Sequence, residues 1–282
     1  MNIYEKYFGT VIENTQKELL KIMVMKKILI VLASIMLFSS FEITQTDDDR
    51  IPNNAYKTGE ELEYLLYYGL IDGGKAKLTI RDASSNGKQI THAKAEAKTM
   101  GFTRMFIAID DVYESYFDET NCKPIKAIRD IKEDDYKFYN EVTYNHDNNT
   151  VNSSKSGTVD VPENIFDILS SLYYMRRTSF DNLKLNETVE SVIYFSDEVF
   201  PYKVIFKGRE VIETKIGKFN ALKFQPVVEV GRVFKEDDDM RFWISDDENH
   251  LPLRAEFDIL VGSIKCDLIK YNGVKNPLAK VN

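Results

Sequence analysis

Apolar and polar side chains alternate with a period of two along most of the chain after residue 56, and short turn sequences separate the alternating segments. Successive side chains of a β-strand point to opposite faces of a sheet, so this period indicates strands that bury one face. In the first segment one face carries Leu62, Tyr64, Leu66 and Tyr68. We predict that Asp72-Gly73-Gly74 then forms a hairpin turn, after which the returning strand carries Ala76, Leu78 and Ile80.

The same pattern predicts a long series of further strands. They cover residues 90–98, 112–118, 125–130, 136–145, 188–195, 202–213, 221–228, 240–245, 253–260 and 263–271. Because no helical pattern regularly separates these strands, a doubly wound α/β fold is excluded. The sequence therefore predicts an all-β protein with a single large antiparallel curved sheet system, either a sandwich or a partly open barrel.

One segment departs from the two-residue period. Between Pro162 and Thr178 the apolar residues recur at helical spacing, and Arg176 and Arg177 follow at the end where cations favour a helix. Proline suits the first helical turn, so we predict one amphipathic helix over residues 162–178. Its apolar stripe must be buried, and we expect it to pack on a concave face of the sheet or to plug one end of a barrel.

A short basic and apolar segment precedes the β region. Met25-Lys26-Lys27 is followed by eleven largely apolar residues, Ile28–Phe38, which is typical of an export signal and too short to span a bilayer. We predict a signal peptide over residues 25–44 that is cleaved between Ser39 and Gln45, and a periplasmic or secreted product. The alternative is an uncleaved amphipathic anchor, which would be the chain's contact with a membrane. No cysteine follows the apolar run, so we do not expect a lipoprotein.

These patterns divide the chain into five parts. We assign residues 1–24 to an upstream extension, 25–44 to the signal, 45–55 to a linker, 56–275 to a single β domain and 276–282 to a tail. The formal net charge of −8 argues against nucleic acid as a partner, since phosphates require a basic surface. Cys266 alternates with apolar strand residues and is expected to be a small buried side chain; a disulfide with Cys122 is the alternative.

The chain carries no recognisable catalytic or metal motif. It has no Gly-x-Ser-x-Gly sequence, and its one Ser-x-x-Lys match, Ser85 to Lys88, contains Asn-Gly and is therefore expected at an exposed hairpin tip. The three histidines are far apart, and the acidic runs lack the spacing of a calcium loop. We therefore expect neither a metal nor a cofactor, and no catalytic residue. A pair of carboxylates brought together by the fold stays open, because its separation is spatial.

One set of residues is a candidate for ligand binding. Arg176 lies beside Tyr173 and Tyr174 at the end of the predicted helix, where a cation and aromatic rings could receive an anionic or sugar ligand. In the C-terminal part, Trp243 and Asp246 complete the candidate set. The structural alternatives are that Arg176 pairs with an acidic strand residue, that Trp243 fills the core and that Asp246 lies in a hairpin turn.

Several longer segments together resemble one protein family. They are Tyr56–Glu60, Tyr67–Gly74, Asp167–Arg176, Ile216–Lys223, Phe242–Asp247, Leu251–Leu253 and Val261–Ser263. In these segments the chain resembles the exported envelope proteins of domain-of-unknown-function family 3108 (DUF3108), common in the Bacteroidetes. The resemblance implies a predominantly β envelope protein with a signal peptide, and it implies no assigned activity.

Three functional hypotheses follow. The first is a non-catalytic envelope protein that binds a partner, glycan or lipid on a concave β surface, in cell-surface or polysaccharide assembly. The second is a periplasmic carrier of lipid or lipoprotein with an apolar cavity. The third is a secreted hydrolase that uses a carboxylate pair. A carrier requires a cavity of several hundred cubic ångströms, whereas a hydrolase requires two acids in a cleft.

Overall fold

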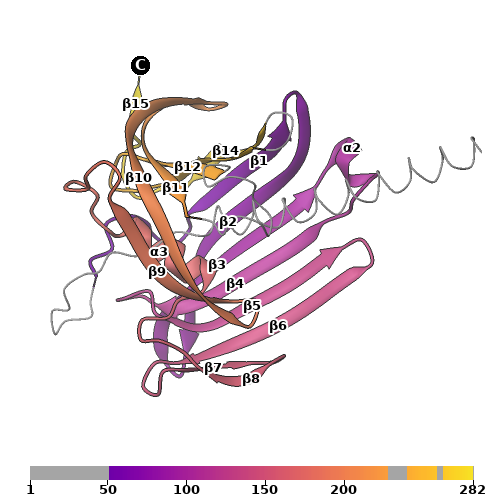
Figure 1. Ribbon diagram of the computed structural model, residues 1–282, viewed down its shortest axis with the longest axis vertical. Coiled ribbons are helices and arrows are strands. Elements are labelled where there is room, and N and C mark those ends of the chain that lie inside the picture. The colour runs from indigo at the N-terminus through magenta and orange to yellow at the C-terminus, as the bar shows by residue number, and fades with distance from the viewer. Residues whose placement is uncertain (1–50, 228–239, 259–262, 282) are drawn as a thin grey trace, which may run out of the picture.

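The protein folds into one large antiparallel sheet with two helices (Figure 1), as described by a computed structural model for residues 51–227, 240–258 and 263–281. The predicted extension, the signal and most of the linker lie outside these residues. The sheet is strongly curved and is not closed into a barrel. The predicted all-β class is thus confirmed, in the form of the partly open barrel.

The elements follow one another along the chain with short connections. The strands are β1 (Glu61–Tyr68), β2 (Ile71–Ser85), β3 (Lys88–Thr99), β4 (Asp110–Asp118), β5 (Pro124–Glu133), β6 (Tyr136–Asn145), β7 (Thr150–Ser153), β8 (Gly157–Asp160), β9 (Thr188–Phe195), β10 (Glu198–Thr214), β11 (Gly217–Pro226), β12 (Met240–Ser245), β13 (Pro252–Asp258), β14 (Ser263–Asn272) and β15 (Lys280–Val281). The helices are α2 (Gly101–Arg104) and α3 (Ile168–Arg176).

The order of strands in the sheet differs from a simple meander at one place. It runs β8-β7-β6-β5-β4-β3-β2-β1-β14-β13-β12-β11-β10-β9, and β15 pairs with β11. The first and the last long strands of the domain, β1 and β14, therefore pair in the middle of the sheet. Residues 276–281, which we assigned to a tail, extend the domain, because β15 joins the sheet there.

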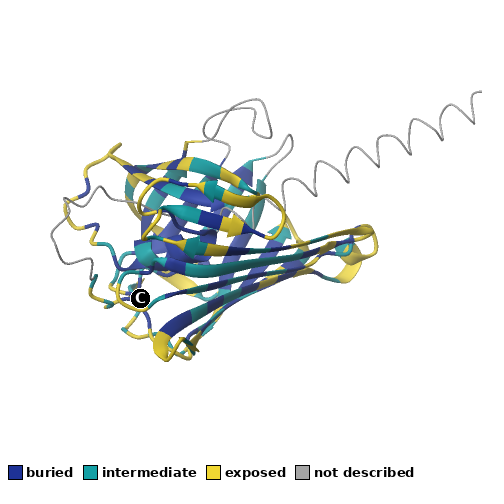
Figure 2. Cartoon of the chain, turned by 90° about the horizontal axis from the view of Figure 1, so that it is seen from below, coloured by how far each residue is buried: buried dark blue, intermediate teal, exposed yellow. Residues whose placement is uncertain are grey.

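Burial alternates along the strands and places the core on the concave side (Figure 2). In β4, for example, Tyr113, Ser115 and Phe117 are buried, whereas Glu114 and Tyr116 between them are only half-buried. Helix α3 packs against β3, β4 and β9, so it fills the hollow of the curved sheet. The predicted position of the helix is confirmed.

The helix is shorter than the predicted range of 162–178, and our prediction that it begins at Pro162 is wrong. Glu163 and Asn164 instead form a turn, with Asn164 at a φ of 57°, and Phe166 then forms a parallel backbone bridge with Ile193 of β9. Helix α3 begins after Asp167, whose carboxylate accepts hydrogen bonds from the backbone N–H groups of Leu169 and Ser170, at 2.8 and 3.0 Å. The four-residue helix α2 was not predicted.

We predict that Asp167→Ala destabilises the protein by about 1–2 kcal/mol, because it removes the helix cap and the acceptor for the Ser115 hydroxyl. Urea unfolding followed by circular dichroism measures this change. Asp181→Ala is the matched control, since Asp181 is exposed and outside any helix. Equal stability of the two variants would contradict a capping role for Asp167.

The first hairpin turn is also placed differently from the prediction. The turn lies at Gly69-Leu70, and Asp72-Gly73-Gly74 belongs to β2. The glycine at 74 serves close packing, because a Cβ there would lie 2.8 Å from the carbonyl oxygen of Lys98 on β3. By contrast, Asn86-Gly87 forms the tight turn that we predicted, with φ of 51° and 77°. Cys122 and Cys266 are both buried and free, as expected for Cys266.

Candidate functional site

The structure places Arg176 in the core. Its side chain is 1% exposed, and its guanidinium donates to both carboxylate oxygens of Glu60, at 2.6 and 2.8 Å, and to the carbonyl oxygen of Asn249 at 3.0 Å. The rings of Tyr56 and Tyr173 lie 5.4 and 5.2 Å from the guanidinium. This geometry favours the structural alternative, in which Arg176 pairs with an acidic residue next to a strand.

The other three predicted residues lie in separate surroundings. Tyr174 is half-buried and packs on Phe166, with 4.8 Å between the ring centroids. Trp243 is 6% exposed and its indole N–H donates to Glu210 at 2.6 Å. Asp246 follows β12 and forms an ion pair of 3.2 Å with Arg209. The structure thus brings Arg176 and Tyr173 together and gives the other three different neighbours; as a ligand site the set stays a prediction.

A different candidate site lies where the two ends of the sheet approach each other. There the tip of the β9–β10 hairpin, Ser196-Asp197, contacts strands β5 to β7. Arg129 of β5 donates to the Ser196 hydroxyl at 2.7 Å, and Asn140 of β6 donates to the Asp197 carboxylate at 3.1 Å. We call this contact region between the hairpin tip and β5–β7 the seam.

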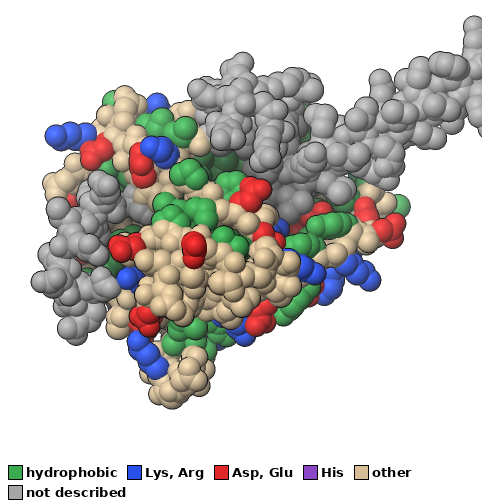
Figure 3. Space-filling view, turned by 60° about the horizontal axis from the view of Figure 1, so that its bottom comes forward, with side chains coloured by type: hydrophobic (Ala, Val, Ile, Leu, Met, Phe, Trp, Pro, Cys, Tyr) green, Lys and Arg blue, Asp and Glu red, His purple; other side chains and the backbone are tan. Residues whose placement is uncertain are grey.

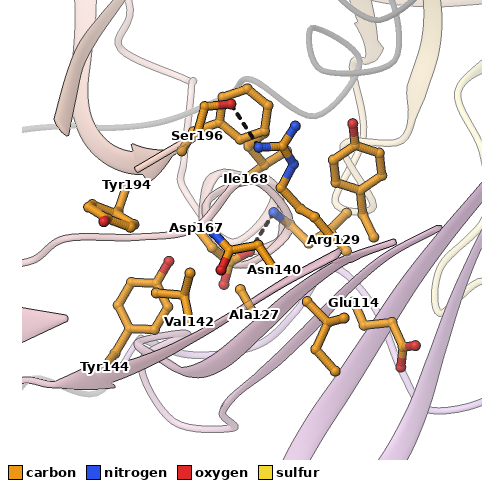
Figure 4. Close-up of a pocket in the computed structure, with 14 residues that line it drawn as sticks. Glu114, Ala127, Arg129, Asn140, Val142, Tyr144, Asp167, Ile168, Tyr194 and Ser196 are labelled. Carbon is orange, nitrogen blue, oxygen red and sulfur yellow. Dashed lines mark hydrogen bonds between the residues drawn. The ribbon is translucent and has the colours of Figure 1, made fainter. Parts of the chain in front are cut away.

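A small cavity lies beneath the hairpin tip, beside the start of α3 (Figure 4). It has a volume of about 30 Å³, which is room for about two water molecules. Most of its wall is apolar, and the polar residues that line it are Tyr113, Glu114, Arg129, Asn140, Tyr144, Asp167, Tyr194 and Ser196.

Several polar atoms around this cavity lack a full set of hydrogen-bond partners among the described residues. The Tyr144 hydroxyl has none, and Nε of Arg129 and the hydroxyl of Tyr113 have no other residue as partner, since the Tyr113 hydroxyl reaches the Arg129 side chain. Leaving a buried polar group unpaired costs about 1–3 kcal/mol, so such groups normally face water or a ligand. The Arg129 guanidinium is also held flat against the Phe195 ring, 4.2 Å from its centroid, which fixes the direction of its donors.

Two carboxyl groups form a buried pair next to Arg129 on the same face. Asp111 of β4 and Glu133 of β5 are 1% and 2% exposed, and their carboxyls lie within hydrogen-bond reach of each other. Burial raises the pKa of Asp111 to about 6. Burial and the neighbouring Asp111 carboxylate raise the pKa of Glu133 to about 7. Asp111 Oδ2 and Glu133 Oε1 have no donor as partner among the described residues. One proton shared between the two carboxyls would supply the missing hydrogen bond.

Sequence reasoning missed both parts of this site. Asp111 and Glu133 are brought together by the pairing of β4 with β5, and no short motif marks them. One signal was available: Asp111 is in phase with the inward-facing Tyr113, Ser115 and Phe117, so the alternation itself assigned an acid to the core face. The seam depends on the curvature of the sheet, which the alternation does not determine.

The charge of the hairpin tip is held by hydrogen bonds. Burial alone would raise the pKa of Asp197, but donors that include Ser153, Ser156 and Asn140 outweigh it and lower that pKa. Burial raises the pKa of Asp167, although Ser115 and two backbone N–H groups oppose this.

Among the described residues no three His, Cys, Asp or Glu side chains are grouped to hold a metal ion. None of the described helices is long and apolar enough to cross a membrane.

Fold and site define an open, antiparallel β half-barrel that is filled by one helix and carries at its seam a small, largely apolar cavity with a few polar groups. The chain belongs to the family described as "Protein of unknown function (DUF3108)", whose model matches residues 63–269. The predicted family is thereby confirmed. No curated protein matches the chain.

Two solved structures are similar in fold. The chain is similar to a beta-barrel-like protein of domain of unknown function DUF1849 from Brucella abortus, with a TM-score of 0.51 and 10% sequence identity; the match covers 79% of this chain and 100% of that one. A DUF1089 family protein from Pseudomonas aeruginosa matches with a TM-score of 0.39 and 10% identity, over 70% and 96% of the two chains. At these identities the first similarity supports the fold alone.

Proposed function

We propose that this chain is an exported, non-catalytic protein of the bacterial cell envelope that binds a ligand at the seam, in cell-surface or polysaccharide assembly. The observation that carries this proposal is the set of buried polar groups around the cavity with free hydrogen-bonding capacity: the Tyr144 hydroxyl, and the Arg129 side chain and Tyr113 hydroxyl, which have only each other there. A site of convergent polar groups with an apolar wall, on a rigid sheet, is the usual form of a small-ligand site. The signal peptide predicted from the sequence at residues 25–44 is the support for the location.

The alternative of a lipid carrier receives less support from the cavity. An acyl chain needs several hundred cubic ångströms of space, whereas the closed seam cavity has about 30 Å³, so any ligand larger than a few atoms, a lipid or a sugar, requires the seam to open. An acyl chain there would leave the Arg129 and tyrosine donors unpaired.

The alternative of a hydrolase rests on the Asp111–Glu133 pair. Glycosidases keep their two carboxyls about 5 Å or more apart, whereas these two lie within hydrogen-bond reach of each other. A pair that shares one proton is instead known from aspartic-protease chemistry. Hydrolytic turnover that Glu133→Gln abolishes would establish this second function and would overturn the proposal that the protein is non-catalytic.

Native mass spectrometry of protein purified from the periplasm tests the binding function. We expect a bound species with the wild type, and its loss with Arg129→Met, which keeps an unbranched apolar side chain and removes the guanidinium over Phe195 with its donors. Lys132→Met is the matched control, because Lys132 lies on the same strand with an exposed side chain. A clean mass without any adduct, or equal adducts in both variants, would overturn the proposed site.

A further inference from the structure

We infer that the seam is a gated site for the hydroxyl groups of a neutral sugar, and that the tip of the β9–β10 hairpin must lift to admit it. This inference rests on the proposed function and adds the class of ligand and the route of entry. Four observations carry it: the backbone of the tip, the contacts of its side chains, the position of its hinge and the chemistry of the cavity.

The backbone of the tip adopts a conformation that its residues do not favour. Ser196 and Asp197 have φ of 53° and 62°, in the left-handed region where Asn-Gly is the preferred pair. The chain uses that preferred pair, Asn86-Gly87, in the hairpin between β2 and β3. The β9–β10 turn therefore keeps two less suitable residues, and strained turns of this kind are typical of functional positions.

Their side chains account for this choice. Asp197 Oδ1 accepts hydrogen bonds from Asn140, Ser156 and Ser153, and Ser196 accepts one from Arg129. All four donors belong to β5, β6, β7 and the turn after β7, on the other side of the seam. We call Ser196 and Asp197 with these hydrogen bonds the latch. A glycine turn would be less strained but would leave the seam without this closure.

Backbone hydrogen bonds hold the β9–β10 hairpin to the segment before α3 only behind the tip. Phe166, just before α3, accepts a hydrogen bond from the N–H of Tyr194 at 2.8 Å and donates one to the carbonyl of Val192 at 3.1 Å. These bonds hold β9 at Val192–Tyr194. Lifting of the tip from residue 195 onward would thus break side-chain hydrogen bonds of the latch and leave the strand pairing intact.

The cavity selects against charged and fully apolar ligands. Arg129 lines the cavity together with Asp167, and Asp197 follows Ser196 at the hairpin tip, so a phosphate or carboxylate would meet as much negative as positive charge. On the face shown in Figure 3 acidic and basic side chains are likewise interspersed. An apolar chain would leave the polar groups of the cavity without hydrogen-bond partners. Neutral hydroxyls both donate and accept, so they can satisfy Arg129, Tyr113, Tyr144 and the carboxylates together.

A reversible disulfide across the latch tests the gate. In the double variant Ser153→Cys, Asp197→Cys the new thiols replace two side chains in direct contact. The probes are maltohexaose, chitohexaose, dodecyl maltoside, dodecylphosphocholine and sialyllactose, with affinities from calorimetry. We expect the wild type to bind a neutral sugar, and the oxidised variant to bind it at least about tenfold more weakly than the same variant when reduced, because the disulfide holds the tip in the closed state while both forms lack the Asp197 carboxylate.

The outcomes separate the inference from the function on which it rests. If no neutral sugar binds the wild type or the reduced variant, the sugar class is overturned, whatever adduct native mass spectrometry shows. Preference for dodecylphosphocholine or sialyllactose would also overturn it, whereas dodecyl maltoside binding without maltohexaose binding would assign the sugar to a glycolipid headgroup. Equal sugar binding by the oxidised and reduced forms would overturn the gate alone.

Hydrogen exchange provides a readout that needs no ligand and no new cysteine. We expect the amides of Phe195–Glu198 to exchange about tenfold faster in Asp197→Ala than in the wild type, since the latch holds them closed. Glu198→Gln is the matched control, because Glu198 is the exposed next residue. Unchanged exchange at the tip in Asp197→Ala would show that the latch does not hold it.

Discussion

Replacement of Arg176 by methionine should lower the free energy of unfolding by about 3–5 kcal/mol, which is a large part of the stability of a typical domain. The reason is the carboxylate that remains. Glu60 is 1% exposed and its two oxygens are paired with Arg176, so the variant leaves a buried charge without a counterion. Urea unfolding at neutral pH, followed by circular dichroism, measures the loss.

A double-mutant cycle separates the lost pair from the lost packing. Glu60→Leu should be similarly destabilising, because it leaves the buried guanidinium with only carbonyl acceptors such as Asn249. The double variant Glu60→Leu, Arg176→Met should be more stable than either single variant, since an apolar pair of similar size carries no desolvation cost. Additive losses would contradict a direct interaction. Arg209→Met is the control, as its pair with Asp246 is largely exposed.

The carboxyl pair should make the protein less stable as the pH rises from about 4 to about 8. The folded state raises the pKa of Asp111 to about 6 and that of Glu133 to about 7, so between pH 4 and 7 the folded state binds more protons than the unfolded state. The free energy of unfolding therefore falls with increasing pH through this window. With about 1.4 kcal/mol per pKa unit, the total change is on the order of 3–6 kcal/mol.

The variant Asp111→Asn, Glu133→Gln isolates this contribution. Its amides keep the shape of the pair and cannot ionise, so its stability should change much less than that of the wild type between pH 4 and 8. Unfolding curves collected at matched ionic strength over that range give the difference at each pH. Parallel stability profiles of the two proteins would falsify the proton-sharing pair. Asp130→Asn, Lys132→Gln on the exposed side of β5 is the control.

Much of the fold could be predicted because alternation reports burial directly. The strands from β3 to β6 and from β9 to β14 were found close to their observed bounds, since each buries one face. The short strands β7, β8 and β15 were missed, because two to four residues carry too little periodicity. The start of α3 was misplaced because the pairing of Phe166 with Ile193, a contact remote in sequence, outweighed the local preference of Pro162.

The site was predictable to a smaller extent. The pattern around Arg176 and Tyr173 drew attention to a real cluster, yet its burial depends on Glu60, more than a hundred residues away in sequence. Trp243 and Asp246 lie in other surroundings, and no local pattern indicates how far these residues are from Arg176. The seam joins Arg129 to Ser196 only because the sheet curves until its two ends meet. Curvature on this scale is a property of all the strands together, and no single segment encodes it.

The pairing of β1 with β14 determines when the sheet can be completed during folding. Strands β1 to β8 can form one hairpin after another, but the edge of β1 is closed only when residues 263–272 reach it. Until then the central strand exposes unpaired backbone groups, which are prone to pair with other chains. A chain truncated before residue 263 should therefore keep this edge open and aggregate more readily than the full chain.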